Sequence, residues 1–260
     1  MAEPFVLHPM ALVHPDAVIG EGVIVEAYAV VGPGVTLGSG AWIGHHAVID
    51  RNTTLGADCR IFHSAFIGAP PQDLKYRDEE TRVEVGERTT IREFSSVHRG
   101  TTATGITRIG TDALLMAYTH VAHDCEIGNR VIMANGVQLG GHVHVGDWAI
   151  IGGLTPVHQF CRIGAHAMVG GGLRASQDVA PFMMAADEPM RLVGINSVGL
   201  RRRGFSPESI TALKRAHRLL CRSHLNTEQA VTAIREQLPQ LPEIDQLLSF
   251  LSSSHRGFVK

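Results

Sequence analysis

Aromatic residues, charged residues and long apolar runs are all scarce in this sequence. Phe, Trp and Tyr make up only 5% of its 260 residues, so the core has to be built from small and aliphatic side chains. Charged residues reach 18%, and a net charge of −2 gives no chain-wide attraction to nucleic acid or to a membrane surface. No apolar run approaches the ~18 residues of a membrane span, and the first residues show no basic segment followed by an apolar one. We therefore expect a soluble cytoplasmic protein that neither binds nucleic acid nor inserts into a membrane.

Cysteine is equally sparse. The four cysteines, Cys59, Cys125, Cys161 and Cys221, contain no CxxC pair, which argues against a zinc ribbon and against a dense disulfide framework. Reduced thiols are the expected state. Glycine, in contrast, accounts for 28 of 260 residues, about one and a half times its average usage. Abundant glycine together with few aromatics indicates a repeat.

An aliphatic residue recurs at every sixth position over most of the chain. The positions follow in unbroken step from Val13 to Ile67, the register returns at Val85, Ile91 and Val97, and it runs again from Ile109 to Val169. Most of these residues are followed at once by Gly or by a small or acidic residue. Such regularity identifies a hexapeptide repeat.

Each hexapeptide predicts a short strand followed by a tight bend. The aliphatic residue fills a narrow interior, and Gly permits special backbone angles at the bend. Three such sides close one triangular coil, and stacked coils pair their strands in parallel about 4.8 Å apart. Residues 18 apart then lie above one another, and about eight coils give a prism roughly 38 Å tall. Periodicity alone leaves the hand of the coil open.

Two stretches interrupt the repeat, and a different pattern follows it. Residues Pro70–Arg82 and Arg99–Arg108 contain no hexapeptide, so we expect loops that project from the prism. After Val169 the repeat fades, and Ser206-Pro207-Glu208 has the form of a helix start. Apolar residues then recur at helical spacing in three segments. We predict a parallel β-helix over residues 1–190 and a C-terminal α-helical domain of three helices over residues 191–260.

The spacing of 18 gathers polar residues on one wall of the later coils. Seven of the fifteen histidines fall within residues 98–166, and none takes an inward aliphatic position, so we expect their side chains outside the prism or at its corners. Stacking brings a particular group onto one wall: His123, Asp124, Gly141, His142, His158 and Gln159.

This group suits acyl transfer. Gly141 above His123 leaves room for a substrate and a backbone N–H facing it. A neutral imidazole can take the proton of an attacking hydroxyl, an adjacent carboxylate can hold its tautomer, and an N–H can stabilise the oxyanion. Consecutive residues of a flat strand point to opposite sides, so the His123–Asp124 pair requires that these two residues turn a corner.

Two other classes of function are open from the residues alone. Several histidines on one wall could meet a neighbouring subunit and bind zinc, as in hexapeptide-repeat carbonic anhydrases, which pair two histidines about five residues apart with a third one two coils away. No histidine pair in this sequence has that spacing, and we expect no metal. A non-catalytic β-helix scaffold would need neither the loops nor the histidine wall.

Longer strings make the chain similar to one family. They are Gln72-Asp73-Leu74-Lys75-Tyr76, Ile91-Arg92-Glu93, His98-Arg99-Gly100-Thr101, His120-Val121-Ala122-His123-Asp124-Cys125, Gly140-Gly141-His142, Val157-His158-Gln159-Phe160-Cys161 and Gly199-Leu200-Arg201-Arg202-Arg203-Gly204-Phe205. On these strings the chain resembles, over essentially its whole length, the acyl-carrier-protein-dependent UDP-N-acetylglucosamine O-acyltransferases of lipid A synthesis. A general hexapeptide transferase would share the repeat without these strings.

The resemblance implies a left-handed parallel β-helix and a homotrimer with active sites in clefts between adjacent prisms. It implies that a 3-hydroxyacyl chain passes from acyl carrier protein to the 3-position of UDP-N-acetylglucosamine without a cofactor. His123 matches the general base, Asp124 its orienting acid, and the Gly141 N–H the oxyanion donor. The related N-acyltransferase would need a separate N-terminal nucleotide-binding domain, and here the hexapeptides begin by Val13.

The resemblance also assigns substrate-binding residues: Gln72, Asp73, Lys75, His98, His120, His142, His158, Gln159, Gly171, Asn196, Arg202 and Arg203. Asp73 is expected on the sugar, and the last three on the nucleotide. Gly171 falls at the family's acyl-chain ruler, where a glycine favours a longer chain. Pro189 and Val198 stand where well-known members carry a histidine and a glutamate, and the choice between a 3-hydroxy and a 3-amino sugar stays open.

A basic helix face is the expected docking site for the carrier protein, which is acidic in this family. Its residues recur at nearly helical spacing on the first tail helix: Lys214, Arg215, Arg218 and Arg222. A solvated helix face explains the same pattern equally well. Acyl-chain length and carrier selectivity stay open.

Overall fold

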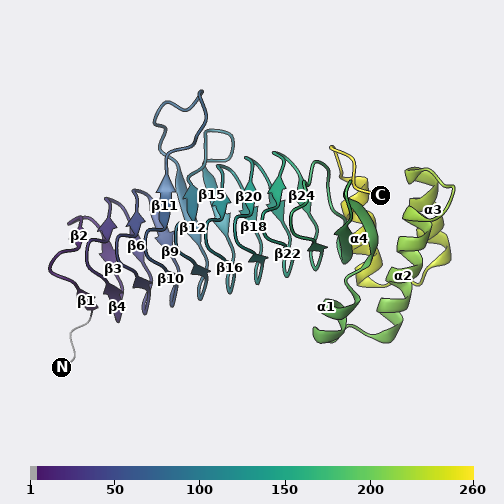
Figure 1. Cartoon of the computed structure of the whole chain (residues 1–260), viewed down its shortest axis with the longest axis horizontal. Coiled ribbons are helices and arrows are strands. Elements are labelled where there is room, and N and C mark those ends of the chain that lie inside the picture. Colours follow the sequence, from purple (N-terminus) through teal and green to yellow (C-terminus); the bar gives the residue numbers. More distant parts are fainter. Residues whose placement is uncertain (1–4) are drawn as a thin grey trace.

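Three parallel sheets wind the chain into a triangular β-helix. The computed structural model describes residues 5–260, and Figure 1 shows the coils stacked from the N-terminus toward a group of helices at the other end. Most strands contain only two to four residues, because each is one side of a hexapeptide coil and a turn follows it. Successive strands contribute to sheets A, B and C in turn, so neighbours within one sheet come from neighbouring coils.

Sheet A is the longest of the three and runs from the first coil to the helices. All its pairs are parallel except the last, in which β26 and β27 are antiparallel. Its eleven strands are, in order, β1 (Phe5–Leu7), β4 (Val23–Val25), β7 (Trp42–Ile43), β10 (Arg60–Ile61), β13 (Thr90–Ile91), β16 (Leu114–Leu115), β19 (Ile132–Met133), β22 (Ile150–Ile151), β25 (Met168–Val169), β26 (Met183–Ala186) and β27 (Arg191–Ile195).

Sheets B and C contain eight strands each, which matches the eight coils expected from the repeat. Sheet B consists of β2 (Leu12–Val13), β5 (Val30–Val31), β8 (Val48–Ile49), β11 (Phe66–Ala69), β14 (Ser96–His98), β17 (His120–Val121), β20 (Gln138–Leu139) and β23 (Pro156–Val157). Sheet C consists of β3 (Val18–Ile19), β6 (Thr36–Leu37), β9 (Thr53–Leu55), β12 (Arg82–Val85), β15 (Ile106–Ile109), β18 (Glu126–Ile127), β21 (His144–Val145) and β24 (Arg162–Ile163).

The strand register follows the predicted spacing of 18 except beside two inserted loops. Val121 pairs with Leu139, which is 18 residues later. Ile67 pairs with Val97, 30 residues later (18 + 12), and Val97 pairs with Val121, 24 residues later (18 + 6). The extra residues form loop 1 (residues 70–81) and loop 2 (residues 99–105), which project from the prism in Figure 1. Loop 2 is shorter than predicted, because residues 106–108 extend β15 along the neighbouring strand β12.

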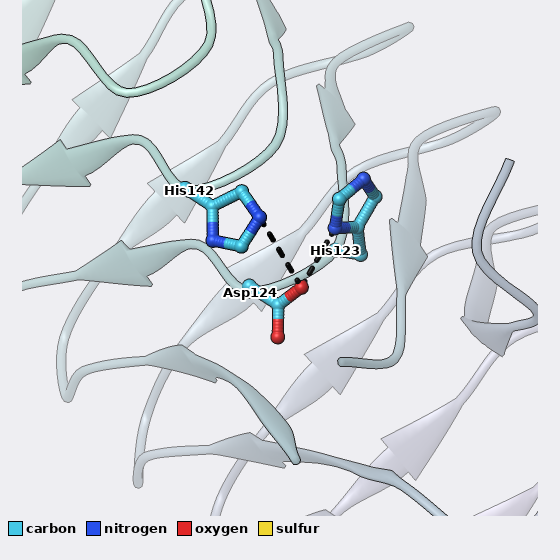
Figure 2. A group of neighbouring side chains, drawn as sticks. All are labelled: His123, Asp124 and His142. Carbon is cyan, nitrogen blue, oxygen red and sulfur yellow. Dashed lines mark hydrogen bonds and ion pairs between the residues drawn. The ribbon is translucent and has the colours of Figure 1, made fainter. Parts of the chain in front are cut away.

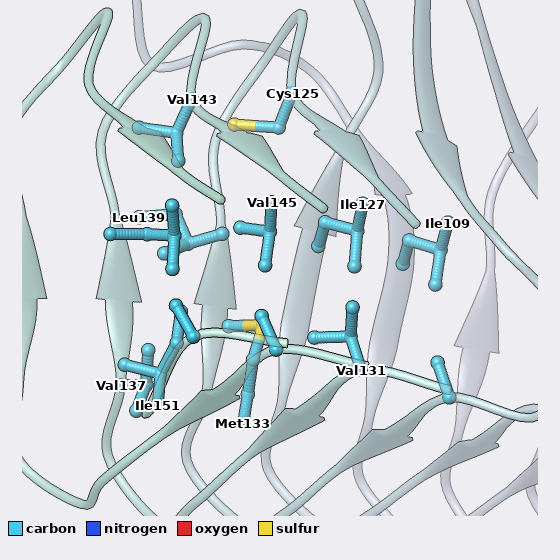
Figure 3. Packing of buried hydrophobic residues seen from close by; sticks show 14 of the residues in the cluster. Ile109, Cys125, Ile127, Val131, Met133, Val137, Leu139, Val143, Val145 and Ile151 are labelled. Atoms are coloured by element: carbon cyan, nitrogen blue, oxygen red, sulfur yellow. The ribbon is translucent and has the colours of Figure 1, made fainter. Parts of the chain in front are cut away.

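The interior is a ladder of aliphatic side chains, as the repeat predicts. Figure 3 shows Ile109, Ile127 and Val145 stacked from coil to coil, with the thiol of Cys125 in a small inward position. All three aliphatic residues are buried. A close-packed interior of this kind fixes the spacing between coils and therefore the positions of outward-facing residues.

Each coil turns at three corners, and many corner residues have a left-handed backbone. The B/C corner, where the chain passes from sheet B to sheet C, includes Asp124 (φ 60°), His142 (61°) and Phe160 (64°). The C/A corner includes Asp112 (55°), Arg130 (54°), Trp148 (61°) and His166 (59°), and the A/B corner includes Tyr118 (62°) and Leu154 (57°). Side chains at such positions point outward in columns along the prism.

Four helices follow the coils within the described residues, one more than predicted. They are α1 (Ser197–Arg202), α2 (Pro207–Cys221), α3 (Thr227–Gln237) and α4 (Pro242–Ser252). The predicted start of α2 is confirmed, with Ser206 as the N-cap and Pro207 in the first turn. The added helix α1 has only six residues, too few for a helical period to be seen in the sequence. The division into residues 1–190 and 191–260 stays a prediction.

Among residues 5–260, no helix combines the length and the apolar character needed to cross a membrane.

Candidate active site

The B/C corner brings His123 and Asp124 together in the way that the sequence required. The left-handed backbone of Asp124 turns the chain, so the two adjacent side chains lie on the same side. Nδ1 of His123 lies 2.7 Å from Oδ2 of Asp124, a hydrogen bond drawn in Figure 2. With Nδ1 donating its proton to the carboxylate, Nε2 of a neutral His123 is the basic nitrogen.

Loop 2 surrounds the Asp124 carboxylate with donors. The backbone N–H of Thr101 donates to it over 3.0 Å and the Thr101 hydroxyl over 2.7 Å, and the Thr104 hydroxyl is a further donor. Burial alone would raise the pKa of Asp124, but hydrogen bonds from Thr104, His123 and Thr101 outweigh it and lower the pKa to about 2. The carboxylate is therefore charged and fixed at neutral pH. Thr101 and Thr104 were not among the predicted site residues.

Gly141 lies directly over the His123 ring, as the spacing of 18 predicts. A Cβ atom at this position would be 2.6 Å from Cε1 of His123 and 2.8 Å from Nε2, so only glycine fits without displacing the imidazole. The backbone N–H of Gly141 donates to no acceptor within residues 5–260. An N–H without an acceptor, on a residue packed over the imidazole, is available to stabilise an oxyanion.

His142 completes the cluster from the next coil. Its Nε2 lies 3.7 Å from Oδ2 of Asp124, its ring meets His123 edge to face at 5.2 Å, and it stacks on Phe160 at 4.6 Å. Burial lowers the pKa of His142, although the charges of Asp124 and of Asp73 in loop 1 act in the opposite direction. The ring is therefore favoured in its neutral form.

The same three side chains, His123, Asp124 and His142, are close enough to hold a metal ion. Two imidazoles and a carboxylate are a donor set that divalent metals accept. The Asp124 oxygens, however, already accept hydrogen bonds from Thr101, Thr104 and His123. A carboxylate with these partners fits the role of an orienting acid better than that of a metal ligand.

Two more predicted histidines lie on sheet B beside the dyad. His98 and His120 meet edge to face at 4.8 Å, and Nδ1 of His120 bonds the Ser96 hydroxyl at 2.8 Å. His98 is only 5% exposed although the neighbouring Val97, not His98, is the inward aliphatic residue of β14. Burial, helped by the nearby charges of His120 and His123, lowers the pKa of His98 to about 4. Its buried Nδ1 has no hydrogen-bond partner in the described part of the chain.

Comparison with known proteins covers nearly the whole chain. A family model described as Udp N-acetylglucosamine O-acyltransferase, domain 2, matches residues 178–259, and one described as bacterial transferase hexapeptide (six repeats) matches residues 106–141. An acyl-(acyl-carrier-protein)–UDP-N-acetylglucosamine O-acyltransferase from Burkholderia lata is 50% identical over 259 residues, which are 98% of this chain and 99% of that protein. The chain belongs to this acyltransferase family.

Solved structures agree with this assignment. The UDP-N-acetylglucosamine O-acyltransferase of Moraxella catarrhalis is 40% identical, with a TM-score of 0.94 over 98% of this chain and 99% of that one. The UDP-N-acetylglucosamine acyltransferase of Bacteroides fragilis is also 40% identical, with a TM-score of 0.95 over 97% and 99%. The match confirms the predicted fold class, a left-handed parallel β-helix with a C-terminal helical region, and the predicted enzyme class, an acyltransferase.

The other residues that the family resemblance assigned on this wall lie around the dyad without bonding to it. His158 turns its Nδ1 toward the carbonyl of Gln159, and the Gln159 backbone lies over Gly140. Within residues 5–260, no hydrogen bond joins the His158 or Gln159 side chain to the dyad. Their substrate-binding roles stay predictions.

Loop 1 carries the first three residues assigned by the family resemblance. Gln72 and Lys75 are exposed, and Asp73 is half-buried. The Asp73 carboxylate accepts the Lys75 N–H over 2.9 Å, which closes a tight turn. Loop 1 connects β11 of sheet B to β12 of sheet C, so it leaves the prism at the B/C corner of an earlier coil.

The remaining assigned residues lie away from the B/C corner. Gly171 is exposed near the A/B corner, above Gly153. Asn196 is 4% exposed, and its side chain caps α1 and donates to the His166 carbonyl over 3.0 Å. Arg203 lies over the Trp148 ring at the C/A corner, whereas Arg202 is exposed on α1.

Three of the four expected docking residues share one groove. Lys214, Arg218 and Arg222 line a depression between α2 and β27, together with Ser197. Arg215 instead turns toward α3 and donates to the Gln237 carbonyl over 3.2 Å. The groove is the part of the predicted basic face that can receive an acidic surface.

Proposed function

We propose that this protein transfers a 3-hydroxyacyl chain from acyl carrier protein to the 3-position of UDP-N-acetylglucosamine, the first step of lipid A biosynthesis. The observation that carries the proposal is the geometry of the B/C corner. His123 is hydrogen-bonded to a buried carboxylate, and its ring packs against Gly141, whose N–H donates to no acceptor within residues 5–260. The names of the relatives supply both substrates.

His123 acts as the general base in this proposal. Its Nε2 takes the proton from the 3-hydroxyl group of the sugar as the oxygen attacks the carbonyl carbon of the acyl thioester. The Gly141 N–H donates to the resulting oxyanion. The tetrahedral intermediate then breaks its C–S bond, and His123 returns the proton to the departing thiolate. Asp124 keeps Nδ1 protonated throughout, and its low pKa ensures that it stays an acceptor.

The substrate site is proposed to lie between copies of the chain in a homotrimer. The dyad occupies the B/C corner, whereas Asn196 and Arg203 lie by His166 at the C/A corner. Residues on two different corners of one prism face different directions. A neighbouring prism that presents its C/A corner to the B/C corner would bring the two sets together.

Gly171 is proposed to leave the acyl channel open for a longer hydroxyacyl chain. It is exposed, and a Cβ there would meet the Gly153 carbonyl oxygen at 3.1 Å. A larger side chain would therefore extend away from Gly153 into the space beside the coil. We expect Gly171→Met to shorten the preferred acyl chain.

A cytoplasmic location and a two-domain division at residue 190 remain part of the proposal. The cytoplasmic location is the compartment in which the four cysteines would stay reduced.

The product decides the function. The purified protein is offered UDP-N-acetylglucosamine or its 3-amino analogue with a series of 3-hydroxyacyl carrier proteins, and the products are analysed by mass spectrometry. We expect one added hydroxyacyl group on the 3-hydroxy sugar and a preference for the longer chains. Product formed only with the 3-amino analogue would contradict the O-acyl assignment, and no acylated sugar with any donor would contradict the function.

A further inference from the structure

Arg99 is an arginine buried in a protein whose cations are otherwise mostly at the surface. Its side chain is 1% exposed, and it ranks among the largest fully buried side chains. Removing a guanidinium group from water is costly unless its donors are all satisfied. The position follows His98 directly and opens loop 2, and the proposed reaction assigns no role to Arg99 itself.

The guanidinium group joins segments that are far apart in the sequence. Nε donates to the Tyr76 hydroxyl in loop 1 over 2.9 Å, and Nη1 donates to the Gly68 carbonyl of β11 over 2.8 Å. Asp50 lies 3.4 Å from Nη1, and Asp78 of loop 1 lies 3.6 Å from Nη2. Arg99 therefore ties loop 1 to the wall of the prism.

The backbone of Arg99 connects the same point to loop 2. Its N–H donates to the Ala69 carbonyl over 3.0 Å, at the register shift between β11 and β14. Two residues later, Thr101 donates to the carboxylate of Asp124. The two loops beside the dyad thus leave the prism from one anchor.

Apart from Arg99, two side chains of the prism hold the second half of loop 1: Arg51 pairs with Asp78, and Asn52 donates to the Thr81 carbonyl over 3.4 Å. The Tyr76 hydroxyl donates to the Glu79 carbonyl over 3.0 Å and accepts a hydrogen bond from Arg99. These two bonds fix the position of the tyrosine ring. Leu74, two residues before it, is 96% exposed. The turn that carries Asp73 and Lys75 therefore depends on Tyr76 for its position.

We propose that Arg99 is a positioning residue that holds loop 1 against the B/C corner, so that the side chains of loop 1 can bind the sugar nucleotide. An arginine is required because four partners in different directions need a planar group with several donors, and a lysine ammonium could not reach all of them. The identity of the substrate rests on the proposed function, whereas the position of loop 1 rests on the contacts of Arg99.

The test uses the full-length Arg99→Lys and Arg99→Met variants, with the exposed Arg235→Met on α3 as a matched control. Asp50 and Asp78 are both partly exposed and can be hydrated when Arg99 is lost, so we expect the variants to fold. Losing charged hydrogen bonds of this kind should raise KM for UDP-N-acetylglucosamine about tenfold or more, while kcat changes less than about threefold. Arg235→Met should match the wild type.

Trypsin gives a readout that needs no substrate. Loop 1 contains Lys75 and Arg77, and release of Tyr76 should make cleavage there faster in both Arg99 variants than in the control. Tyr76→Phe removes only the hydroxyl, and with it the bonds to Arg99 and to the Glu79 carbonyl, so it should show the same two effects at a smaller size, about threefold in KM. This milder variant keeps the test decisive if the Arg99 variants fail to fold.

Unchanged cleavage and unchanged KM in the Arg99 variants, or in Tyr76→Phe if those do not fold, would overturn the proposal. A lowered melting temperature with wild-type KM and wild-type cleavage would overturn it as well, because Arg99 would then be structural only. If the wild-type protein does not act on UDP-N-acetylglucosamine, the proposed function fails, but the cleavage result still decides whether Arg99 holds loop 1.

Discussion

The B/C corner and the C/A corner have the same backbone but different chemistry. Asp124 and Asp112 both adopt a left-handed conformation, with φ of 60° and 55°, and both lie beside cationic or basic side chains of neighbouring coils. Asp112 pairs with Arg88 at 2.8 Å and with Arg130 at 3.7 Å, and its side chain is 28% exposed. The side chain of Asp124 is fully buried and faces histidines.

The difference comes from the inserted loops. The coil repeats the same turn at every level, so it can stack side chains but cannot by itself bury one of them at a corner. Loop 2 covers the B/C corner and supplies the threonine donors, whereas the C/A corner at the level of Asp112 has neighbouring charges only. The proposed active site thus lies at the level where loops enclose the repeated scaffold.

The sharpest test of this comparison is to neutralise one aspartate at each corner. Asp124→Asn should lower kcat by about 10²-fold or more, because an amide no longer fixes the tautomer or stabilises the charged form of His123. Asp112→Asn removes surface ion pairs with Arg88 and Arg130, so we expect little change in the free energy of unfolding and an unchanged kcat. Steady-state kinetics of both variants check this, and equal losses of activity would remove the distinction between the corners.

The space over His123 can be filled without changing a charge. Gly141→Ala places a Cβ 2.6 Å from Cε1 of the imidazole, so the ring has to move, and kcat should fall about 10- to 100-fold. Gly194→Ala is the matched control for kcat at saturating carrier protein, because a Cβ there meets nothing within 4 Å and the residue lines only the groove between α2 and β27. The two variants are compared in the same transfer assay. Wild-type activity in Gly141→Ala would show that the imidazole position does not matter.

Charge reversal on α2 tests the groove beside β27. The double variant Arg218→Glu, Arg222→Glu should raise KM for the acyl carrier protein about three- to tenfold, because an attractive surface becomes repulsive. Added salt should then no longer raise this KM as it does in the wild type. The control Arg235→Glu on α3 reverses the charge of one residue outside the groove and should have little effect on this KM. Carrier affinity that is unchanged in the double variant at low salt would exclude this face as the docking site.

Acid should lower the free energy of unfolding through one buried histidine near each corner. The two contributions should be similar, and smaller than the effects of the variants above. Burial lowers the pKa of His98 near the B/C corner and of His166 at the C/A corner from 6.5 to about 4. Between these values the unfolded chain takes up protons that the folded chain refuses, so the free energy of unfolding falls as the pH falls from 6.5 to 4. Urea unfolding at several pH values should show a shallower decrease in His98→Asn and in His166→Asn. The exposed His144→Ala should keep the wild-type slope, and a wild-type slope in both asparagine variants would contradict the assignment.

The stacking in the site could be predicted from the sequence, because the interior is periodic. A fixed period of 18 places Gly141 over His123 once the aliphatic ladder is recognised, and the structure confirms both the ladder and the stack. Pairing of His123 with Asp124 required a corner at these two residues, and the left-handed backbone of Asp124 provides that corner.

The enclosing residues could not be predicted in the same way. Thr101 and Thr104 belong to an aperiodic loop, so no spacing relates them to Asp124, although the run Thr101-Thr102-Ala103-Thr104 is rich in hydroxyl donors. Arg99 is buried through contacts with residues 23 to 49 positions away. The predicted end of loop 2 at Arg108 was wrong for a similar reason. Residues 106–108 belong to β15 because they pair with β12, and the hexapeptide pattern does not reveal this pairing.

Removal of the imidazole tests the central claim most directly. His123→Ala and the control His144→Ala, which removes an exposed imidazole from sheet C, are compared for acyl transfer and for thermal unfolding. We expect His123→Ala to unfold like the wild type and to lose more than about 10²-fold in kcat, with His144→Ala fully active. A folded His123→Ala variant with wild-type turnover would contradict the assignment of the B/C corner as the catalytic centre.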